Sequence, residues 1–404
     1  MGCKVNQYDG ALLRRLLFKR GFRETKDPEL VVVNTCAVTK KAIIKDRQLL
    51  ARLRRRYPRS RFVVMGCWPQ TEPEIAAAFK NKGIVFWGVG DAEGLLKKIE
   101  SMFSLAESVK ERRAPAKGEG LLAATNRSRY FLKVSDGCNQ FCAYCLIPYA
   151  RGRLKSRPSA AISKEAKAAT EAGYREIVLC GIHLGLYGAD GKGKEKNLSA
   201  LIGTLLKIKN LGRLRLSSLE VTEVTPALIK LLARESRLCR HLHISLQSGS
   251  DKILKLMKRP YTAGVFARVV AALRQAVPNI ALTTDVIVGF PGETAADFRA
   301  SYAFAEKMAF SRIHVFPFSA HEQTAAFKLP GRVSAAALKE RATRLRRLSA
   351  RLEEDYRQKI LAVCRRSGLK LVREQGAAGR ERLKTEFGFD LWLDKKDLTK
   401  NALV

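Results

Sequence analysis

Stretches typical of buried strands alternate with helical stretches between residues 129 and 319, and this alternation restricts the fold more than any other feature. Strands are expected at 129–137, 176–185, 213–220, 241–249, 280–293 and 312–319, with helices at 164–172, 198–208, from Pro226, 262–276 and 295–308. Successive βα units imply a parallel sheet with right-handed crossovers, either open or curled into a partial barrel. The active site of such a sheet lies at the carboxyl ends of its strands.

The first hundred residues also alternate between strands and helices, and a cysteine stands at each of three junctions. Cys3 precedes a helix that ends at Gly21, Cys36 follows the strand "PELVVVNT", and Cys67 follows the strand "RFVVMG". Such junctions meet at one edge of an open parallel α/β sheet, where ligands bind. The three thiols are therefore expected either to share a ligand or to be small buried apolar groups.

Two further segments complete the expected organisation. Residues 107–127 are charged and contain Pro and Gly without apolar periodicity, which predicts a linker. After Pro330 a highly charged helix is expected, and the short alternating stretches of the tail predict a small β module.

Charge is the strongest bulk signal. The 75 Lys and Arg against 38 Asp and Glu give a formal net charge of +37, which favours a polyanionic partner. No apolar run approaches the roughly 20 residues of a membrane span, and no export signal opens the sequence, so the protein is expected in the cytoplasm. Because cytosolic thiols stay reduced, nine cysteines favour metal binding over disulfides.

Three of these cysteines lie within eight residues, in the stretch "SDGCNQFCAYCLIPYARGR". Cys138, Cys142 and Cys145 follow the first strand of the alternating region, and their spacing is CxxxCxxC. A structural zinc site needs four closed ligands, and no fourth Cys or His stands nearby. A bacterial ferredoxin run uses evenly spaced CxxC pairs and a fourth Cys before Pro. Three thiolates on one loop fit an iron-sulfur cubane with an open fourth iron better than zinc or unrelated thiols.

The loop resembles the signature of radical S-adenosylmethionine enzymes, including an aromatic residue, Tyr144, before the last cysteine. The resemblance implies that the open iron chelates the amino and carboxylate groups of S-adenosylmethionine. Reductive cleavage of that cofactor would then give a 5′-deoxyadenosyl radical.

The phrases "NTCAVT", "GCWPQ", "HISLQSGSDKILKLMKR" and "DVIVGFPGET" are similar to the methylthiotransferase family within that superfamily. The resemblance implies two 4Fe-4S clusters, the S-adenosylmethionine cluster on Cys138, Cys142 and Cys145 and an auxiliary cluster on Cys3, Cys36 and Cys67. It also implies an α/β protein whose central partial (β/α)6 barrel lies between an N-terminal open parallel α/β domain and a small TRAM-like β module. The implied division is 1–106, a linker at 107–127, 128–352 for the radical domain, and 353–404 for the helix end and the RNA-binding TRAM-like module.

Several strand-end residues are expected to contact S-adenosylmethionine, although ordinary strand-end structure would explain them as well. They are Tyr144, Gly181, Glu220, Gln247 and Gly289. The glycine pattern of "WGVGDAEG" lacks the spacing of a dinucleotide loop and predicts a turn. The remaining thiols, Cys180, Cys239 and Cys364, and the histidines His241, His243 and His321 are expected to be structural.

"GCKVNQYDG" and "SSLEVTEVTPALI" resemble the family branch that acts on N6-threonylcarbamoyladenosine. The implied reaction is methylthiolation of carbon 2 of that nucleoside at position 37 of tRNA, with two S-adenosylmethionine consumed. Alternatives are the isopentenyladenosine reaction and a non-catalytic iron-sulfur RNA-binding protein. The expected partners are the anticodon stem-loop and a flavodoxin or ferredoxin, and the protein is expected to be a monomer. Arg151, Arg153 and Arg157 are candidates for the substrate carboxylate.

Three departures from the family pattern accompany the resemblance. The family has a strand before the cysteine at position 3, whereas this sequence begins at Met1. His321, Glu322 and Gln323 replace the Arg-Pro-Gly turn that is expected after the sixth strand. The tail after about Gly368 is short for a complete TRAM barrel.

Overall fold

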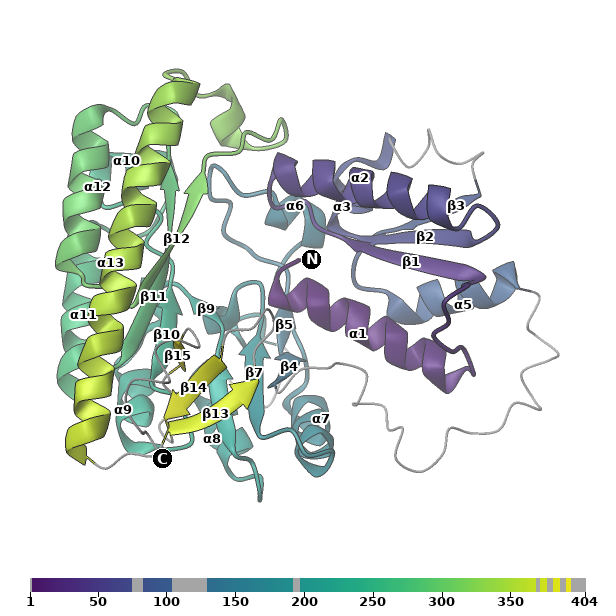
Figure 1. Cartoon of the computed structure of the whole chain (residues 1–404), viewed down its shortest axis with the longest axis horizontal. Coiled ribbons are helices and arrows are strands. Elements are labelled where there is room, and N and C mark those ends of the chain that lie inside the picture. The colour runs from purple at the N-terminus through teal and green to yellow at the C-terminus, as the bar shows by residue number, and fades with distance from the viewer. Residues whose placement is uncertain are drawn as a thin grey trace. The chain divides into compact units, whose positions relative to one another are not determined.

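The structure is a computed structural model that describes residues 2–74, 83–103, 129–191, 197–367, 371–375, 381–385 and 390–393. Its packing forms two compact units (Figure 1). The first comprises residues 1–182 and 319–327, and the second comprises residues 183–318 and 328–404. The predicted linker at 107–127 lies outside the described residues, so the predicted domain boundaries remain predictions.

A three-stranded parallel sheet forms the first part of unit 1, in the order β1-β2-β3. Its strands are β1 (Leu30–Thr35), β2 (Arg61–Gly66) and β3 (Ile84–Trp87). Its helices are α1 (Lys4–Lys19), α2 (Lys40–Arg56), α3 (Cys67–Thr71) and α5 (Ala92–Met102). The predicted open parallel α/β arrangement is therefore confirmed for this part.

Both faces of this sheet are covered because side chains alternate along β2. Phe62 and Val64 pack with residues of α2, whereas Val63 and Met65 pack with residues of α1 and α5. Figure 1 shows α2 on one side of the strands and α1 with α5 on the other. Burial on both faces explains the continuous apolar run "RFVVMG".

The rest of unit 1 contains the strand that precedes the CxxxCxxC loop. Its elements are β4 (Arg129–Lys133), β5 (Ser135–Asp136), α6 (Ile147–Arg151), β6 (Lys155–Ser156), α7 (Ser159–Glu171) and β7 (Glu176–Cys180). β4 pairs in parallel with β7, and β5 pairs antiparallel with β6. The cysteine loop therefore leaves and returns through one short β ladder.

Unit 2 is built on a four-stranded parallel sheet in the order β12-β11-β10-β9. The strands of that sheet are β9 (Ser218–Leu219), β10 (His241–Ile244), β11 (Ala281–Val288) and β12 (Arg312–Pro317), and unit 2 also contains β8 (Arg213–Leu216), which is not part of it. Its short helical turns are η3 (Leu184–Leu186), η4 (Val221–Glu223) and η5 (Ala325–Lys328), the last of which crosses the unit boundary. Its helices are α8 (Leu198–Leu206), α9 (Pro226–Arg234), α10 (Asp251–Leu256), α11 (Ala263–Ala276), α12 (Ala295–Lys307) and α13 (Ala335–Ser367).

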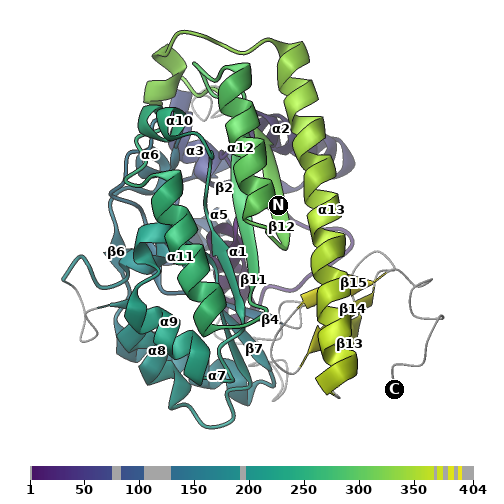
Figure 2. The ribbon, with the colours of Figure 1, turned by 90° about the vertical axis from the view of Figure 1, so that its left-hand side faces the viewer.

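Figure 2 shows α11, α12 and α13 running alongside the strands β11 and β12. The long α13 is the charged helix predicted after Pro330. At its end, β13 (Leu371–Gln375), β14 (Glu381–Thr385) and β15 (Asp390–Leu393) form an antiparallel sheet. The described part of the tail is thus a small β module, as predicted. No described helix is long and apolar enough to cross a bilayer.

Candidate iron-sulfur site

Cys3, Cys36 and Cys67 all lie where the sequence placed them, at junctions of unit 1. Cys3 is the N-cap of α1, and its Sγ accepts a hydrogen bond from the Asn6 amide at 3.5 Å. Cys36 follows β1, and Cys67 is the first residue of α3 after β2. Cys36 and Cys67 are buried, whereas Cys3 is exposed. Three thiols from different elements thus converge on one edge of the sheet.

The buried side chain of Asn6 and the half-buried side chain of Asn34 tie α1 to the end of β1. The Asn6 side chain donates to Asn34 Oδ1 at 2.8 Å and to the Thr35 carbonyl at 2.9 Å, and the Asn34 side chain donates to the Asn6 carbonyl at 2.7 Å. Asn6 is 2% exposed, so these bonds replace water that the amide cannot reach. They fix the helix that carries Cys3 beside the strand that leads to Cys36.

Gly66 makes the tight passage from β2 to Cys67 possible. Its backbone has φ 105° and ψ −153°, a region that is essentially restricted to glycine. A Cβ built there would lie 2.5 Å from the Thr35 carbonyl oxygen and 2.8 Å from Asn34 Oδ1. The close approach lets Cys67 lie beside the end of β1.

The environment of the thiols differs from that of free cysteine. Burial raises the pKa of Cys67 to about 11, although the charge of Arg151 and a hydrogen bond from it oppose the rise. The Cys36 and Cys3 thiols also raise this pKa. Burial raises the pKa of Cys36 as well, and a hydrogen bond from the Val38 backbone partly offsets it.

The CxxxCxxC loop is closed at its base. Cys138 N donates to the Gly152 carbonyl at 3.0 Å, and Leu154 N donates to Asn139 Oδ1 at 3.0 Å. Gly137 has φ 69°, and a Cβ there would lie 2.0 Å from the Arg153 carbonyl oxygen. Within the loop, Cys145 N donates to the Cys142 carbonyl at 3.0 Å. These bonds hold Cys138, Cys142 and Cys145 on one compact turn.

A buried ion-pair network connects the two cysteine groups, and the sequence analysis missed it. Arg151 Nη1 lies 3.0 Å from Asp9 Oδ2 and 3.0 Å from Asp136 Oδ1. Lys133 pairs with the same two carboxylates. Asp9 lies on α1, about one helical turn after Asn6, whose backbone N–H binds the Cys3 thiol. Asp136 lies two residues before Cys138. The only sequence signal was a pair of polar residues, Asn6 and Asp9, three apart on a helix with apolar neighbours.

The segment Ser319–Phe327 also belongs to unit 1 although it follows β12. Ala326 N donates to the Ala143 carbonyl at 2.7 Å, inside the CxxxCxxC loop. The His321 ring lies 3.3 Å from the Val38 carbonyl, and Gln323 donates to the Thr71 carbonyl at 2.5 Å. His321, Gln323 and Ala326 therefore brace the segments beside both cysteine groups.

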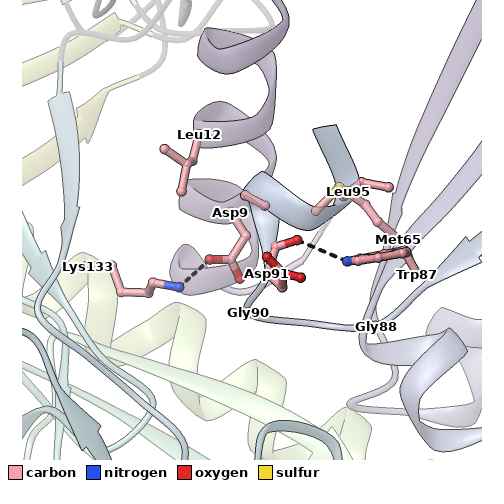
Figure 3. Close-up of a pocket in the computed structure, with 10 residues that line it drawn as sticks. Asp9, Leu12, Met65, Trp87, Gly88, Gly90, Asp91, Leu95 and Lys133 are labelled. Carbon is pink, nitrogen blue, oxygen red and sulfur yellow. Dashed lines mark hydrogen bonds and ion pairs between the residues drawn. The ribbon is translucent and has the colours of Figure 1, made fainter. Parts of the chain in front are cut away.

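A small pocket opens beside this network (Figure 3). Asp9 and Lys133 line one side, and Trp87, Gly88, Gly90 and Asp91 line the other. Asp91 caps α5 by accepting from Gly94 N at 2.8 Å, and the Trp87 indole donates to the Asp91 carbonyl at 3.0 Å. The stretch "WGVGDAEG" is a turn and a helix cap, as predicted.

The residues expected to contact S-adenosylmethionine divide between the units. Tyr144 and Gly181 belong to unit 1, whereas Glu220, Gln247 and Gly289 belong to unit 2. Glu220 forms an ion pair with Arg259. Gln247 has φ 65° and forms an isolated parallel bridge with Val286.

Gly289 has φ 73°, and a Cβ there would lie 2.2 Å from Leu338 Cδ1 of α13. Packing against α13 therefore accounts for this glycine within unit 2. This packing does not test whether Gly289 contacts S-adenosylmethionine.

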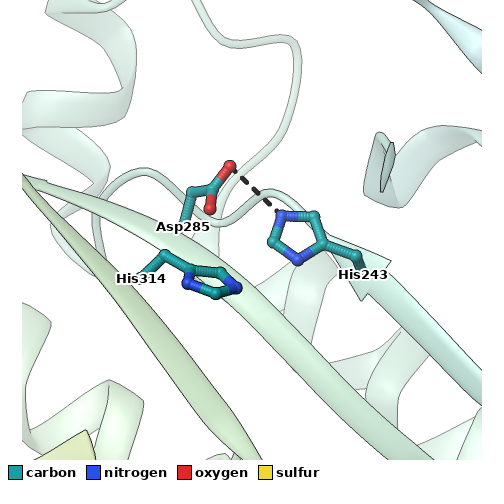
Figure 4. A group of neighbouring side chains, drawn as sticks. All are labelled: His243, Asp285 and His314. Carbon is teal, nitrogen blue, oxygen red and sulfur yellow. Dashed lines mark ion pairs between the residues drawn. The ribbon is translucent and has the colours of Figure 1, made fainter. Parts of the chain in front are cut away.

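His243, Asp285 and His314 come together on neighbouring strands of unit 2 (Figure 4). His243 Nε2 lies 3.1 Å from Asp285 Oδ2, and His243 Nδ1 lies 2.9 Å from Thr283 Oγ1. Thr283 Oγ1 also lies 3.3 Å from His241 Nε2. In one arrangement of protons, His241 donates to Thr283, Thr283 donates to His243, and His243 donates to Asp285, which satisfies each of these contacts. We interpret the group as hydrogen-bonded side chains, because the contacts close without an ion.

Comparison with known proteins agrees with this architecture. Residues 132–305 match the radical SAM superfamily, and residues 1–87 match uncharacterized protein family UPF0004. The structure of the radical S-adenosylmethionine methyltransferase TsrM from Kitasatospora setae superposes with a TM-score of 0.56 at 17% identity, covering 80% of this chain and 69% of that one. This likeness concerns the fold alone. The fold and the CxxxCxxC loop thus define a radical S-adenosylmethionine enzyme.

Relatives define the family within that class. The chain is 38% identical over 374 residues to threonylcarbamoyladenosine tRNA methylthiotransferase MtaB of Bacillus subtilis, covering 88% of this chain and 80% of that protein. It is 37% identical to the protein of the same name in Thermotoga maritima, covering 89% and 83%. It is 34% identical to tRNA-2-methylthio-N(6)-dimethylallyladenosine synthase of Nitratidesulfovibrio vulgaris strain DP4, covering 87% and 81%.

The chain belongs to the radical S-adenosylmethionine tRNA methylthiotransferase family. Its members are enzymes that use S-adenosylmethionine and carry two 4Fe-4S clusters. The two cysteine groups of unit 1 suit such clusters, because each offers three thiols and leaves one iron position open. A buried arginine beside Cys67 provides N–H donors of the kind that cluster sulfur accepts.

Proposed function

We propose that this protein methylthiolates carbon 2 of N6-threonylcarbamoyladenosine at position 37 of tRNA. The structural observation that carries the proposal is the presence of two three-cysteine groups within one compact unit. The choice of nucleoside is supported by the named activity of the Bacillus subtilis and Thermotoga maritima relatives. The isopentenyl reaction is the second candidate, because relatives at 34% identity carry that name.

We assign Cys138, Cys142 and Cys145 to the cluster that binds S-adenosylmethionine and Cys3, Cys36 and Cys67 to the auxiliary cluster. When bound, these groups supply a carbon radical that can break a C–H bond and a sulfur atom for transfer. The residues of the chain hold both groups in place. Asn6, Asn34 and Gly66 position one set of thiols, and the closed base of the CxxxCxxC loop positions the other.

We also assign S-adenosylmethionine contacts to Tyr144, Gly181, Glu220, Gln247 and Gly289. The first two lie next to Cys145 and Cys180 in unit 1, and the other three lie at strand ends of unit 2. Catalysis at strand ends is the rule for parallel sheets of this kind, which supports the assignment.

The threonylcarbamoyl group ends in a carboxylate, so its pocket requires a cation or several donors. Among the three arginine candidates, Arg151 is bound to Asp9 and Asp136, and Arg157 is bound to Glu165 at 2.7 Å. Arg153 is exposed and follows the closed base of the cysteine loop directly. We therefore assign recognition of the substrate carboxylate to Arg153.

The remaining assignments follow from tRNA as substrate. The excess of cations supports binding of the anticodon stem-loop, and the module formed by β13, β14 and β15 is assigned a TRAM-like role in that binding. We propose that the protein acts in the cytoplasm as a monomer and receives electrons from a flavodoxin or ferredoxin.

The decisive experiment presents anaerobically reconstituted protein with two matched anticodon stem-loops, one with each modification at position 37. Mass spectrometry of the digested nucleosides measures the products. We expect the threonylcarbamoyl substrate to be methylthiolated far faster, since a pocket cation left without its carboxylate is costly. Equal conversion, or preference for the isopentenyl substrate, would refute the assignment. Failure to form any 5′-deoxyadenosine would support a non-catalytic RNA-binding protein.

Arg153→Ala tests the carboxylate assignment in the same assay. We expect slower conversion of the threonylcarbamoyl substrate with little change in the affinity for the stem-loop. Arg157→Ala is the matched control, because its guanidinium is already paired within unit 1. An equal loss of tRNA affinity and activity in Arg153→Ala would instead assign Arg153 to a phosphate.

A further inference from the structure

Arg151 is the most deeply buried cation beside the cysteine groups. Its side chain is 0% exposed although the residue ends the short helix α6 directly after the CxxxCxxC loop. Nη1 makes all of its hydrogen bonds to oxygen, with Asp9 Oδ2 and Asp136 as the acceptors. A guanidinium at such a depth needs partners for its other donors as well, because each unsatisfied buried N–H costs free energy.

Those other donors lack an oxygen or nitrogen acceptor. Nε and Nη2 of Arg151 are both buried and have no hydrogen-bond partner among the described residues. Cys67 packs in the same buried cluster as Ala150, the residue before Arg151, and the Arg151 charge lowers the pKa of the Cys67 thiol against the effect of burial. The electrostatic influence of Arg151 extends to Cys3 as well. One edge of the guanidinium therefore binds carboxylates, and the other faces the thiols of the N-terminal group.

We propose that Arg151 is a positioning residue of the auxiliary cluster: its Nε and Nη2 donate hydrogen bonds to the Cys67 sulfur and the adjoining cluster sulfide, and thereby raise the reduction potential of that cluster. This inference rests on the proposed ligation of the cluster by Cys3, Cys36 and Cys67. Hydrogen bonds to cluster sulfurs and nearby charge are the main means by which a protein sets such a potential. A positive charge favours the reduced form because reduction adds an electron.

The residue type fits this role. Arginine presents its donors in a rigid planar fork, so one edge can bind carboxylates while the other binds sulfur. Lysine has a single donor point and could not bridge the two groups. The neighbouring Lys133 also binds Asp9 and Asp136, so that the two cations together balance the two carboxylates.

The arrangement also connects the two cysteine groups mechanically. Asp136 lies on β5 just before Cys138, and Asp9 lies on α1, whose N-cap is Cys3. Through Nη1, Arg151 binds both segments, and its charge acts on the Cys67 thiol. A change at this one side chain therefore acts on the auxiliary group without touching any thiol of the CxxxCxxC loop.

The test uses the full chain carrying Cys138→Ala, Cys142→Ala and Cys145→Ala, so that one cluster remains. Arg151→Met and Arg151→Lys are introduced into this background, with Arg157→Met as a control that breaks a half-buried ion pair of unit 1. Each protein is reconstituted anaerobically and titrated with dithionite and mediators. The cluster takes up one electron from dithionite, passing from the 2+ to the 1+ core, and the electron paramagnetic resonance signal of the reduced form is followed.

We expect Arg151→Met to lower the equilibrium constant for reduction at least tenfold, which is about 59 mV for one electron. Arg151→Lys should restore part of the shift, and Arg157→Met should leave the potential unchanged. Electron-nuclear double resonance should also lose an exchangeable proton coupling in Arg151→Met. A fully loaded Arg151→Met cluster with unchanged potential and unchanged proton coupling would overturn the proposal.

Two further outcomes are distinguishable. If Arg151→Met fails to load, the measurement is made on Arg151→Lys, which keeps the charge but loses the fork. An unchanged proton coupling and potential there would overturn the proposal. If the parent with intact Arg151 binds no cluster at Cys3, Cys36 and Cys67, the proposed ligation itself is wrong.

Discussion

Replacing Gly66 by alanine should damage the auxiliary cysteine group while sparing the CxxxCxxC loop. The backbone at Gly66 occupies a region in which a side chain costs about 1–3 kcal/mol. The added Cβ would also lie 2.5 Å from the Thr35 carbonyl oxygen, and a backbone atom of a central sheet cannot move aside easily. Overpacking of this kind adds about 1–3 kcal/mol. We therefore expect Gly66→Ala to lower the free energy of unfolding by about 2–6 kcal/mol.

Gly90→Ala separates the two contributions. Gly90 has a similar φ of 94°, but a Cβ there would meet nothing within 4 Å. The control should therefore show the backbone cost alone, about 1–3 kcal/mol. The difference between the two variants measures the collision beside Cys67.

The assay combines anaerobic thermal unfolding with iron analysis after reconstitution. Gly66→Ala should lose up to half of the iron and should still form 5′-deoxyadenosine, because only Cys67 is displaced. Gly90→Ala should keep its full iron content. Equal melting temperatures and equal iron in the two variants would refute the argument that close approach at Gly66 shapes the auxiliary group.

Three other predictions follow from the structure. Replacing Cys138, Cys142 and Cys145 by alanine should remove about half of the iron and all formation of 5′-deoxyadenosine. Replacing Cys3, Cys36 and Cys67 should remove the other half of the iron and leave cleavage of S-adenosylmethionine measurable. Loss of all iron in both triple variants would contradict two separate sites. Affinity for tRNA should fall steeply with salt because phosphate contacts release counterions, and removal of residues 369–404 should reduce both affinity and slope in filter binding. Burial raises the pKa of Glu165, but Arg157 and the Tyr130 hydroxyl outweigh burial and hold this pKa below its usual value. Glu165→Gln should therefore lose about 3–5 kcal/mol of stability near pH 7. That loss should shrink as the pH falls below about 4.5, where the carboxyl of the unfolded chain protonates, and should vanish only below the lowered pKa of Glu165 in the folded protein; a pH-independent difference in urea unfolding would contradict it.

Local patterns in the sequence were sufficient for most helices. The helix expected at 262–276 is α11 (Ala263–Ala276), and its N-cap Thr262 accepts from Val265 N at 3.3 Å. By contrast, α7 begins at Ser159, five residues before the expected start. Its first turn, "SAAIS", is built of small residues without an apolar period, so the pattern gave no helical signal there. The helix α10 (Asp251–Leu256) was not predicted either, because its six residues are too few to show a helical period.

The candidate site was predictable only as far as its cysteines. Each thiol stands at a strand end, and strand ends can be recognised from local sequence. The residues that hold those thiols are joined over long separations, as with Asp9 and Arg151 or Gln323 and Thr71. Their polar side chains are of types that ordinarily face water, so no periodicity distinguishes them from solvated residues. Only the tertiary structure shows that Asn6 and Asp9 point inward.

The same reasoning changes how the net charge of +37 is interpreted. Several arginines are buried, and the structure gives carboxylate partners to Arg15, Arg151 and Arg259. A buried pair contributes no net charge, so the excess of cations lies among the other residues. Part of that excess is on α2, where Lys41, Lys45, Arg52, Arg55 and Arg56 are exposed in the same unit as both cysteine groups. Charge reversal on α2 should therefore weaken tRNA binding without altering iron content.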